Sequence, residues 1–235
     1  MTSCINKHIE DLYHLRITLK EILEKEGISR SKLRKDMKEL GLLTPQQWYR
    51  EIDTGIADLD IHMQKLYSNL VKRCKGQNKD KYSLKHYKGL EYLAVNEWVK
   101  FCNQNKGRLV ELWEKFINSG NNLKWQITTD RIDNDKGYTL DNIQFVHLGF
   151  NSWKRNINPL RVRRVNKNWL YFMSGEEASK YFGIRRQTMG DLLRGHYREV
   201  GKQFEVEKST IDEVLKVTKT NNLEDYYYNL QKEGD

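Results

Sequence analysis

The sequence predicts an α+β protein with a mostly helical N-terminal part, a central strand–loop–strand–helix unit and a small C-terminal β-α-α-β module. Three observations support this fold class. Apolar residues recur at helical spacing near the N-terminus. Two strand-like segments, LKWQITTD and NIQFVHL, flank a polar loop rich in turn residues. Beyond Pro159 the composition shifts again, and strand-like segments enclose two short helical patterns.

The chain has 235 residues, a formal net charge of +9 and a pI near 9.3. This length can bury a core and can hold two or three small modules. An excess of cations attracts polyanions through counterion release, so nucleic acid is the leading class of partner. A soluble protein with a lysine-rich surface is the alternative.

Three isolated cysteines, Cys4, Cys74 and Cys102, form no CxxC pair. A four-cysteine zinc site cannot be assembled from them in one chain, and a disulfide framework is not expected, so we interpret them as reduced thiols. The N-terminus has no apolar leader, and no segment has the length of a membrane span. We therefore expect a soluble, cytoplasmic protein with no membrane partner.

The first sixty residues are expected to be helical. Apolar side chains at helical spacing predict one buried stripe, which Gly27 ends: Ile5, Ile9, Leu12, Leu15, Leu19, Ile22 and Leu23. Ser29 is the expected N-cap of a basic second helix that stops at Gly41. Thr44, with Gln47 three residues later, predicts a capping box at the start of a third helix. These helices fit a DNA-binding helix-turn-helix or, slightly better, an ordinary helical hairpin.

The C-terminal module starts with the strand-like segment NWLYFM. Ser174 is the expected N-cap of the next helix, with Glu177 as its capping-box partner, and Gly183 ends that helix. A second helix closes at Gly195, and KQFEVE is expected to return as a strand.

The second helix of this module begins with side chains suited to base edges and phosphates. They are Arg185, Arg186, Gln187 and Thr188. A short helix, a tight turn and a second helix with this start predict a helix-turn-helix that recognises DNA. A surface helix that happens to be basic is the alternative.

No acidic residue occurs between Asn142 and Gly175. The basic residues of this stretch are Lys154, Arg155, Arg161, Arg163, Arg164 and Lys167. Such a run is often a solvated face. Here it joins the central unit to the C-terminal module, where we expect a linker that follows the phosphate backbone.

The central unit carries oxygen ligands at its strand and helix ends. Asp130 closes the first strand and Asn151 lies at the start of the following helix. If the unit folds back on itself, both side-chain oxygens can converge on one ion. Mg²⁺ prefers oxygen and often takes only one or two protein ligands. Asn142, at the start of the second strand, can hold a neighbouring group by hydrogen bonds.

Two other interpretations of the loop were compared with this one. An EF-hand counted from Asp133 would need Gly where Tyr138 stands and Glu where Gln144 stands, so a calcium loop of that kind is excluded. A structural turn of Asp, Asn and Gly residues stays open on spacing alone.

The stretch from Asp130 to Asn156 resembles the HNH (ββα-metal) endonuclease motif of phage and intron-encoded proteins, which commonly runs D-R-I-D-x-x-x-G-Y-x-x-x-N. The upstream segments RCKG, HYKGL and NEWVKF are similar to the helical lead-in of that group. The part from about Val165 to Glu207 is similar to the helix-turn-helix repeat that follows the nuclease in HNH homing endonucleases.

This resemblance implies a function and roles for particular residues. Asp130 and Asn151 would be the metal ligands, and Asn142 would be the middle Asn that orients the active-site network. The implied activity is hydrolysis of a phosphodiester in double-stranded DNA with Mg²⁺ or Mn²⁺, by nicking or double-strand cutting, in a bacterial or phage-infected cell. No zinc is expected, and a monomer is favoured.

Four regions follow from these patterns. We expect a helical N-terminal region (1–60), an HNH nuclease domain with its helical lead-in (61–158), a basic linker with the helix-turn-helix (159–208) and a helical tail (209–235).

Arg131 departs from the histidine-bearing members of the family, in which the residue after the Asp is the general base. An arginine stays protonated and has no acceptor, so it cannot activate water. It can still clamp the scissile phosphate or stabilise developing charge. The base is then a metal-bound hydroxide or another residue, of which His147 is the nearest. A lone strand histidine is more often a packing residue.

Two functions therefore follow from the sequence. The first is a sequence-specific DNA endonuclease of homing type. The second is a DNA-binding regulator or accessory protein with an inactive HNH core, which Arg131 keeps open.

Overall fold

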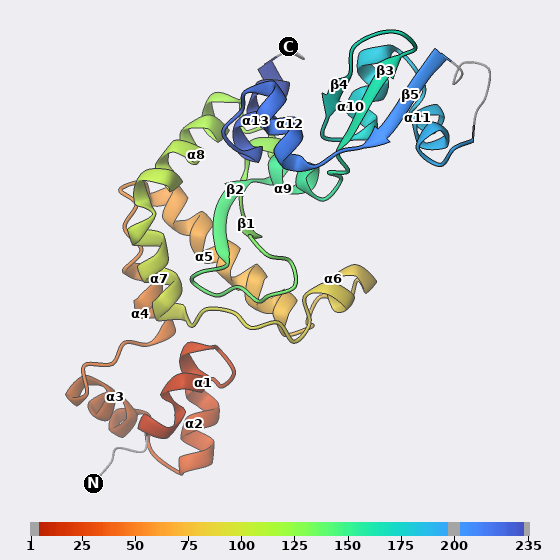
Figure 1. The fold of residues 1–235 in the computed structure, drawn as a ribbon. Helices are drawn as coiled ribbons and strands as arrows, with labels where there is room; N and C mark the ends of the chain where they lie inside the picture. Colours follow the sequence, from red (N-terminus) through yellow and green to blue (C-terminus); the bar gives the residue numbers. More distant parts are fainter. Residues whose placement is uncertain (1–4, 197–202, 233–235) are drawn as a thin grey trace. The chain divides into compact units, whose positions relative to one another are not determined.

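The chain, represented by a computed structural model that describes residues 5–196 and 203–232, is a mixed α/β protein. It divides into two compact units, Met1–Leu148 and Gly149–Asp235 (Figure 1). Within the described residues, each unit holds one small antiparallel sheet surrounded by helices. This confirms the α+β class that the sequence predicts. Cys4 lies outside the described residues.

Short helices open the first unit. They are η1 (Asn6–His8), α1 (Ile9–Tyr13), α2 (Leu19–Glu26), α3 (Arg30–Glu39) and α4 (Pro45–Arg50). The expectation of one continuous helix up to Gly27 is wrong, because the chain turns at Leu15, whose φ is 53°. Thr18 then starts α2 with a full capping box to Glu21. The apolar spacing continues across this break, which is why periodicity alone missed it.

The other caps of this region are confirmed. Ser29 accepts a hydrogen bond from the backbone N–H of Lys32 at the start of α3. Thr44 and Gln47 form the capping box of α4, with Pro45 at the first helical position.

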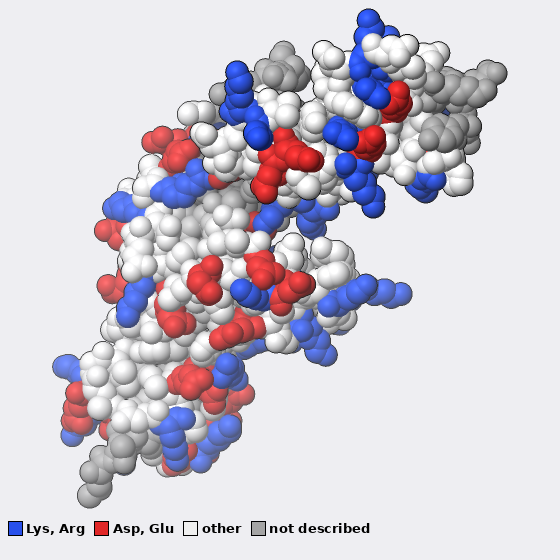
Figure 2. Space-filling view, in the orientation of Figure 1, with Lys and Arg blue, Asp and Glu red and all other residues white. Residues whose placement is uncertain are grey.

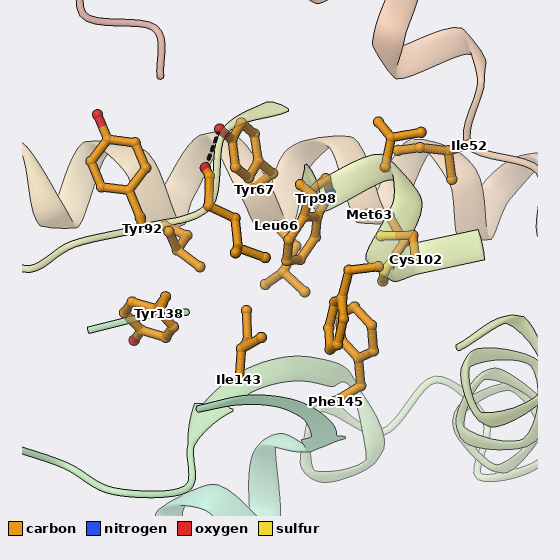
Figure 3. Packing of buried hydrophobic residues seen from close by; sticks show 14 of the residues in the cluster. Ile52, Met63, Leu66, Tyr67, Tyr92, Trp98, Cys102, Tyr138, Ile143 and Phe145 are labelled. Carbon is orange, nitrogen blue, oxygen red and sulfur yellow. Dashed lines mark hydrogen bonds between the residues drawn. The ribbon is translucent and has the colours of Figure 1, made fainter. Parts of the chain in front are cut away.

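The helical lead-in supplies most of the core of the first unit. Its elements are α5 (Ala57–Cys74), α6 (Lys81–His86), α7 (Val95–Gln104), α8 (Lys106–Asn118) and η2 (Leu123–Trp125). Figure 3 shows Trp98 of α7 and Tyr67 of α5 packed together, with Phe145 beside Trp98. The Tyr67 hydroxyl donates to the carbonyl oxygen of Leu93 at 2.8 Å, so its polar end is satisfied inside the core.

The sheet of this unit is a two-stranded hairpin, β1 (Ile127–Arg131) and β2 (Ile143–His147). In its antiparallel register Asp130 pairs with Gln144 and Ile127 pairs with His147. Side chains alternate between the faces of a strand, so Asp130 and Gln144 share one face. Arg131 and His147 lie on the other face, with the residues that pack on the helical core.

The second unit contains almost all of α9 (Leu148–Lys154) and a three-stranded sheet of order β4-β3-β5. Its strands are β3 (Leu160–Arg164), β4 (Leu170–Phe172) and β5 (Phe204–Lys208). The expectation of a linker at the start of this module is wrong for Leu160–Arg164, because this segment is the central strand. Leu160 and Val162 are fully buried, while Arg161 and Arg163, which alternate with them, lie on the other face.

Four helices complete this unit. They are α10 (Gly175–Phe182), α11 (Arg186–Leu193), α12 (Ile211–Thr218) and α13 (Leu223–Lys232). Ser174 caps α10 as expected, whereas Glu177 accepts from the N–H of Met173 rather than that of Ser174. The module is thus β-β-α-α-β, one strand more than the sequence predicts. The tail helices pack on it through a cluster around Met173, Val214 and Tyr226.

Candidate active site

Asp130 stands near the end of β1, and 5% of it is exposed. The side-chain amide of Gln144 donates to its Oδ2 at 2.9 Å across the strand pair. The contact orients the carboxylate. Carboxylate oxygens are ligands that a hard cation such as Mg²⁺ prefers. Gln144 is a site residue that the sequence analysis missed, and only the strand register identifies it.

The strand that carries Asp130 is anchored to α5. A ring nitrogen of His62, Nε2, lies 3.0 Å from the carbonyl oxygen of Ile127 and donates to it. Burial of the imidazole lowers the pKa of His62, so the ring is neutral at pH 7. The contact ties the first residue of β1 to the longest helix of the lead-in.

Arg131 is buried, with an exposed fraction of 7%. Its Nη1 donates to the carbonyl oxygens of Asn134 and Lys136, at 2.6 and 2.9 Å. Its Cζ lies 5.4 Å from the ring centroid of Tyr87 and 5.6 Å from that of Tyr138. These contacts hold the loop between β1 and β2 from the inside. They favour a supporting role over direct contact with a phosphate.

Asn142 braces the same loop at its far end, and 3% of it is exposed. Its Oδ1 accepts from the N–H of Asp133 at 2.7 Å. Its Nδ2 donates to the carbonyl oxygens of Asp133 and Gly137, at 2.9 and 2.8 Å. One amide thus satisfies three backbone groups, which an aspartate or an alanine cannot do. Asn142 thus holds the backbone of the loop, and its role in orienting an active-site network stays a prediction.

Gly137 and Tyr138 of the loop are in close backbone contact with the helical lead-in. Tyr138 donates its N–H to the carbonyl oxygen of Glu91 at 2.8 Å, and it forms a parallel bridge with Tyr92. A Cβ built at Gly137 would lie 2.6 Å from the same Glu91 oxygen. Only glycine allows this approach of two backbones. The lead-in is therefore part of the frame of the site.

His147 is fully buried at the end of β2. Its Nε2 lies 3.1 Å from the carbonyl oxygen of Leu112 and donates to it. Its ring meets that of Trp125 edge to face, with centroids 5.0 Å apart. These contacts match the packing interpretation, and the strand register places His147 on the face opposite to Asp130.

Asn151 lies on α9, in the second unit. The helix is held there by its aromatic residues. Phe150 and Trp153 contact Tyr227 of α13, with ring centroids 5.8 and 5.5 Å apart, and Trp153 also stacks on Tyr226. The tail is thus the support of the helix that carries the second expected metal ligand.

The basic residues after α9 are divided between two environments. Arg155, beyond the end of α9, is exposed, and Lys154 is half-buried. On β3, Arg161 and Arg163 donate to the carboxylates of Glu207 and Glu205, with Nε–Oε2 distances of 2.8 Å in both pairs. These two cations are matched by carboxylates within the sheet, so they carry less uncompensated charge than the sequence suggests. Arg164 and Lys167 are exposed.

The N-terminal end of α11 is exposed, as a recognition helix requires. Arg185, Arg186 and Gln187 are exposed and Thr188 is half-buried. Arg186 lies 3.4 Å from a carboxylate oxygen of Glu176 on α10. Arg185 and Gln187 are thus exposed at one end of a short helix, and Arg186 is exposed but ion-paired.

Within residues 5–196 and 203–232, no group of three or more His, Cys, Asp or Glu side chains is placed to hold a metal ion. The two expected ligands, Asp130 and Asn151, include only one residue of these four types, so they would not form such a group. Their oxygen donors suit Mg²⁺ or Mn²⁺, which complete their coordination with water and phosphate.

The chain was compared with three sets of known proteins. Neither the protein-family models, nor the curated proteins, nor the solved structures contain a match to the chain.

Proposed function

We propose that this protein is a sequence-specific DNA endonuclease of homing type that hydrolyses phosphodiester bonds with a divalent metal ion. The observation that carries the proposal is the braced hairpin: Asp130 near the end of β1, a loop held by Asn142 and Arg131, and a helix with Asn151 directly after β2. This is the element order and residue order of the HNH motif that the sequence resembles.

Each residue then has a task in the proposed reaction. Asp130 and Asn151 would hold the ion, and Gln144 orients the Asp130 carboxylate. A bound divalent ion would supply stabilisation of negative charge on the scissile phosphate and the leaving oxygen. Asn142 keeps the loop in shape, and the exposed end of α11 selects the DNA site.

A second function is favoured by the surroundings of Arg131 and His147. Arg131 cannot accept a proton, and the His147 ring is packed between Leu112 and Trp125. A DNA-binding regulator or accessory protein with an inactive HNH core would show the same features. Both functions share DNA as the partner and differ only in cleavage.

Cleavage of plasmid DNA bearing candidate target sites, with Mg²⁺ or with EDTA, separates the two functions. We expect the wild type to cut or nick only with the metal ion. Asp130→Asn keeps the size and the Gln144 contact but removes the charge, so its cleavage rate should fall by at least about a hundredfold. Asp135→Asn is the matched control, because Asp135 is exposed in the same loop, and it should cut normally.

Asn151→Ala tests the second ligand in the same assay and should also lose metal-dependent cleavage. DNA binding without any metal-dependent cleavage by the wild type would establish the regulator instead.

A further inference from the structure

A strongly basic segment of the lead-in contacts Arg131, at the start of the loop between β1 and β2. Residues 72–88, here called the basic arm, contain seven Lys or Arg residues and a single acidic residue. The arm comprises the end of α5, a turn and the short helix α6. Figure 2 shows Lys and Arg side chains gathered over α6.

Six of the seven cations of the basic arm form no ion pair among the described residues, and the seventh, Lys75, is half-buried near Glu21. Lys72, Lys79, Lys81, Lys85 and Lys88 are exposed, and in the described part of the chain none of them, nor Arg73, forms an ion pair. The one acidic residue, Asp80, is occupied as the N-cap of α6, where it accepts from the N–H of Ser83 at 2.7 Å. The positive potential of the arm is therefore uncompensated within its own segment.

Other charged helices of the first unit differ from the basic arm. Lys20 pairs with Glu24 on α2, Lys35 with Glu39 on α3 and Lys115 with Glu111 on α8, each one helical turn apart. Mixed signs of this kind are typical of a surface that serves solubility. The arm has the opposite pattern, which is typical of a surface that binds a polyanion.

The arm is attached to the loop of the candidate site. Two guanidinium groups lie near the Tyr87 ring: Cζ of Arg73 is 5.1 Å from its centroid and Cζ of Arg131 is 5.4 Å from it. The N–H of Gly89 donates to the carbonyl oxygen of Cys74 at 2.8 Å, which closes the arm at its base. A polyanion bound along the arm would thus run beside the loop that carries Asp133 and Asn142.

We propose that the basic arm is a second DNA-binding surface, which holds the phosphate backbone of duplex DNA beside the candidate active site. Lys72, Lys81 and Lys85 are its principal phosphate contacts. Tyr82, 48% exposed, lies with Lys81 and Lys85 on α6, where its ring contacts that of His86, and it can rest on the sugar edge of the backbone. The inference rests on the proposed DNA substrate, but it does not require that the protein cleaves.

The test is binding of random-sequence duplex DNA by the full chain in EDTA, measured by fluorescence anisotropy over a series of salt concentrations. We compare the triple variant Lys72→Gln, Lys81→Gln, Lys85→Gln with the triple Lys100→Gln, Lys106→Gln, Lys115→Gln on α7 and α8. Both triples remove the same charge from the same unit. Equal thermal unfolding midpoints of the two variants confirm that each is folded.

Each phosphate contact contributes about −0.9 to the slope of log K against log salt. Loss of three contacts should therefore reduce the magnitude of this negative slope by roughly 2 to 3. At about 0.1 M salt the affinity of the arm variant should fall by at least about tenfold. The control triple should change the slope by less than about 1, because those lysines face no DNA.

Equal effects of the two triples would overturn the proposal, since only net charge would then matter. Heparin serves as a second polyanion. If the two triple variants lose the same affinity for duplex DNA and the same affinity for heparin, only net charge matters and the proposal is overturned. Failure of the wild type to cleave, with the arm variant still impaired in binding, would refute the nuclease and leave the arm in place.

Discussion

Arg131 shows how burial decides between two chemical roles for one side chain. The resemblance to the HNH motif places it where a catalytic base would stand, and its charge suggests contact with phosphate. In the structure its guanidinium is directed at the carbonyls of Asn134 and Lys136 and at two tyrosine rings. A planar group with fixed donors suits this task better than a histidine would.

Arg131→Met should therefore destabilise the protein. The change leaves two loop carbonyls without their donor, and the free energy of unfolding should fall by about 2 to 3 kcal/mol. Urea unfolding measures this, and Lys136→Met, an exposed side chain of the same loop, should change it by less than about 0.5 kcal/mol. Unchanged unfolding together with lost cleavage would instead assign Arg131 to the phosphate.

At the scale of single elements, helix α9 and the tail helix α13 pack on one another through aromatic rings. The apolar side of α9 is covered by the rings of Tyr226 and Tyr227, and the Tyr226 hydroxyl donates to Glu177 of α10. The tail is thus joined to α10 and to α9, the helix that carries Asn151. The sequence analysis placed the tail in a region of its own, whereas its rings pack on the neighbouring elements.

Tyr227→Ala should release α9 from this support. Amide hydrogen exchange of residues 148–154 should become faster, and metal-dependent cleavage should fall by at least about tenfold while binding of random DNA is kept. Tyr227→Phe preserves the ring and is the matched control, with exchange and cleavage close to wild type. Slow exchange at α9 in the alanine variant would show that the ring contacts do not hold the helix.

Strand β3 differs from the linker that its charge predicts. LRVRR alternates apolar and basic residues, which is the pattern of a half-buried strand. The same residues also fit a basic linker that follows phosphate, so the local sequence is compatible with both. Its arginines face Glu205 and Glu207 on β5, about forty residues away in the chain, and that pairing is visible only after folding.

At the scale of the whole molecule, DNA is expected to meet two surfaces with different tasks: the end of α11 reads the site, and the basic arm holds the backbone. Of the helices the structure describes, none is long and apolar enough to span a bilayer. The free cysteines Cys74 and Cys102 are buried, and burial raises the pKa of the Cys74 thiol to about 11, so it stays protonated at pH 7.

Arg185→Ala should separate these two tasks. Loss of one base contact should weaken binding to a selected target by about 1 to 3 kcal/mol and leave binding to random DNA nearly unchanged. Anisotropy with a selected and a scrambled duplex measures the difference. Arg194→Ala, at the other end of α11, is the control, and equal losses on both duplexes in the Arg185 variant would argue against a recognition helix.

Local signals determined much of this protein. The caps at Ser29, Thr44 and Ser174, the two hairpin strands and the exposed start of α11 follow from patterns within a few residues, where short-range hydrogen bonds and side-chain alternation dominate.

The tertiary structure alone decided what surrounds the candidate site. The Arg131 guanidinium lies over the Tyr87 ring, and the Glu91 carbonyl accepts a hydrogen bond from the N–H of Tyr138. The Leu112 carbonyl accepts one from His147, 35 residues away in the chain. Such partners are distant in the chain, and no local pattern encodes them. These contacts keep Arg131 inside the loop and His147 buried. Apart from Lys75, the lysines of the basic arm have no such partners in the described part of the chain and are exposed.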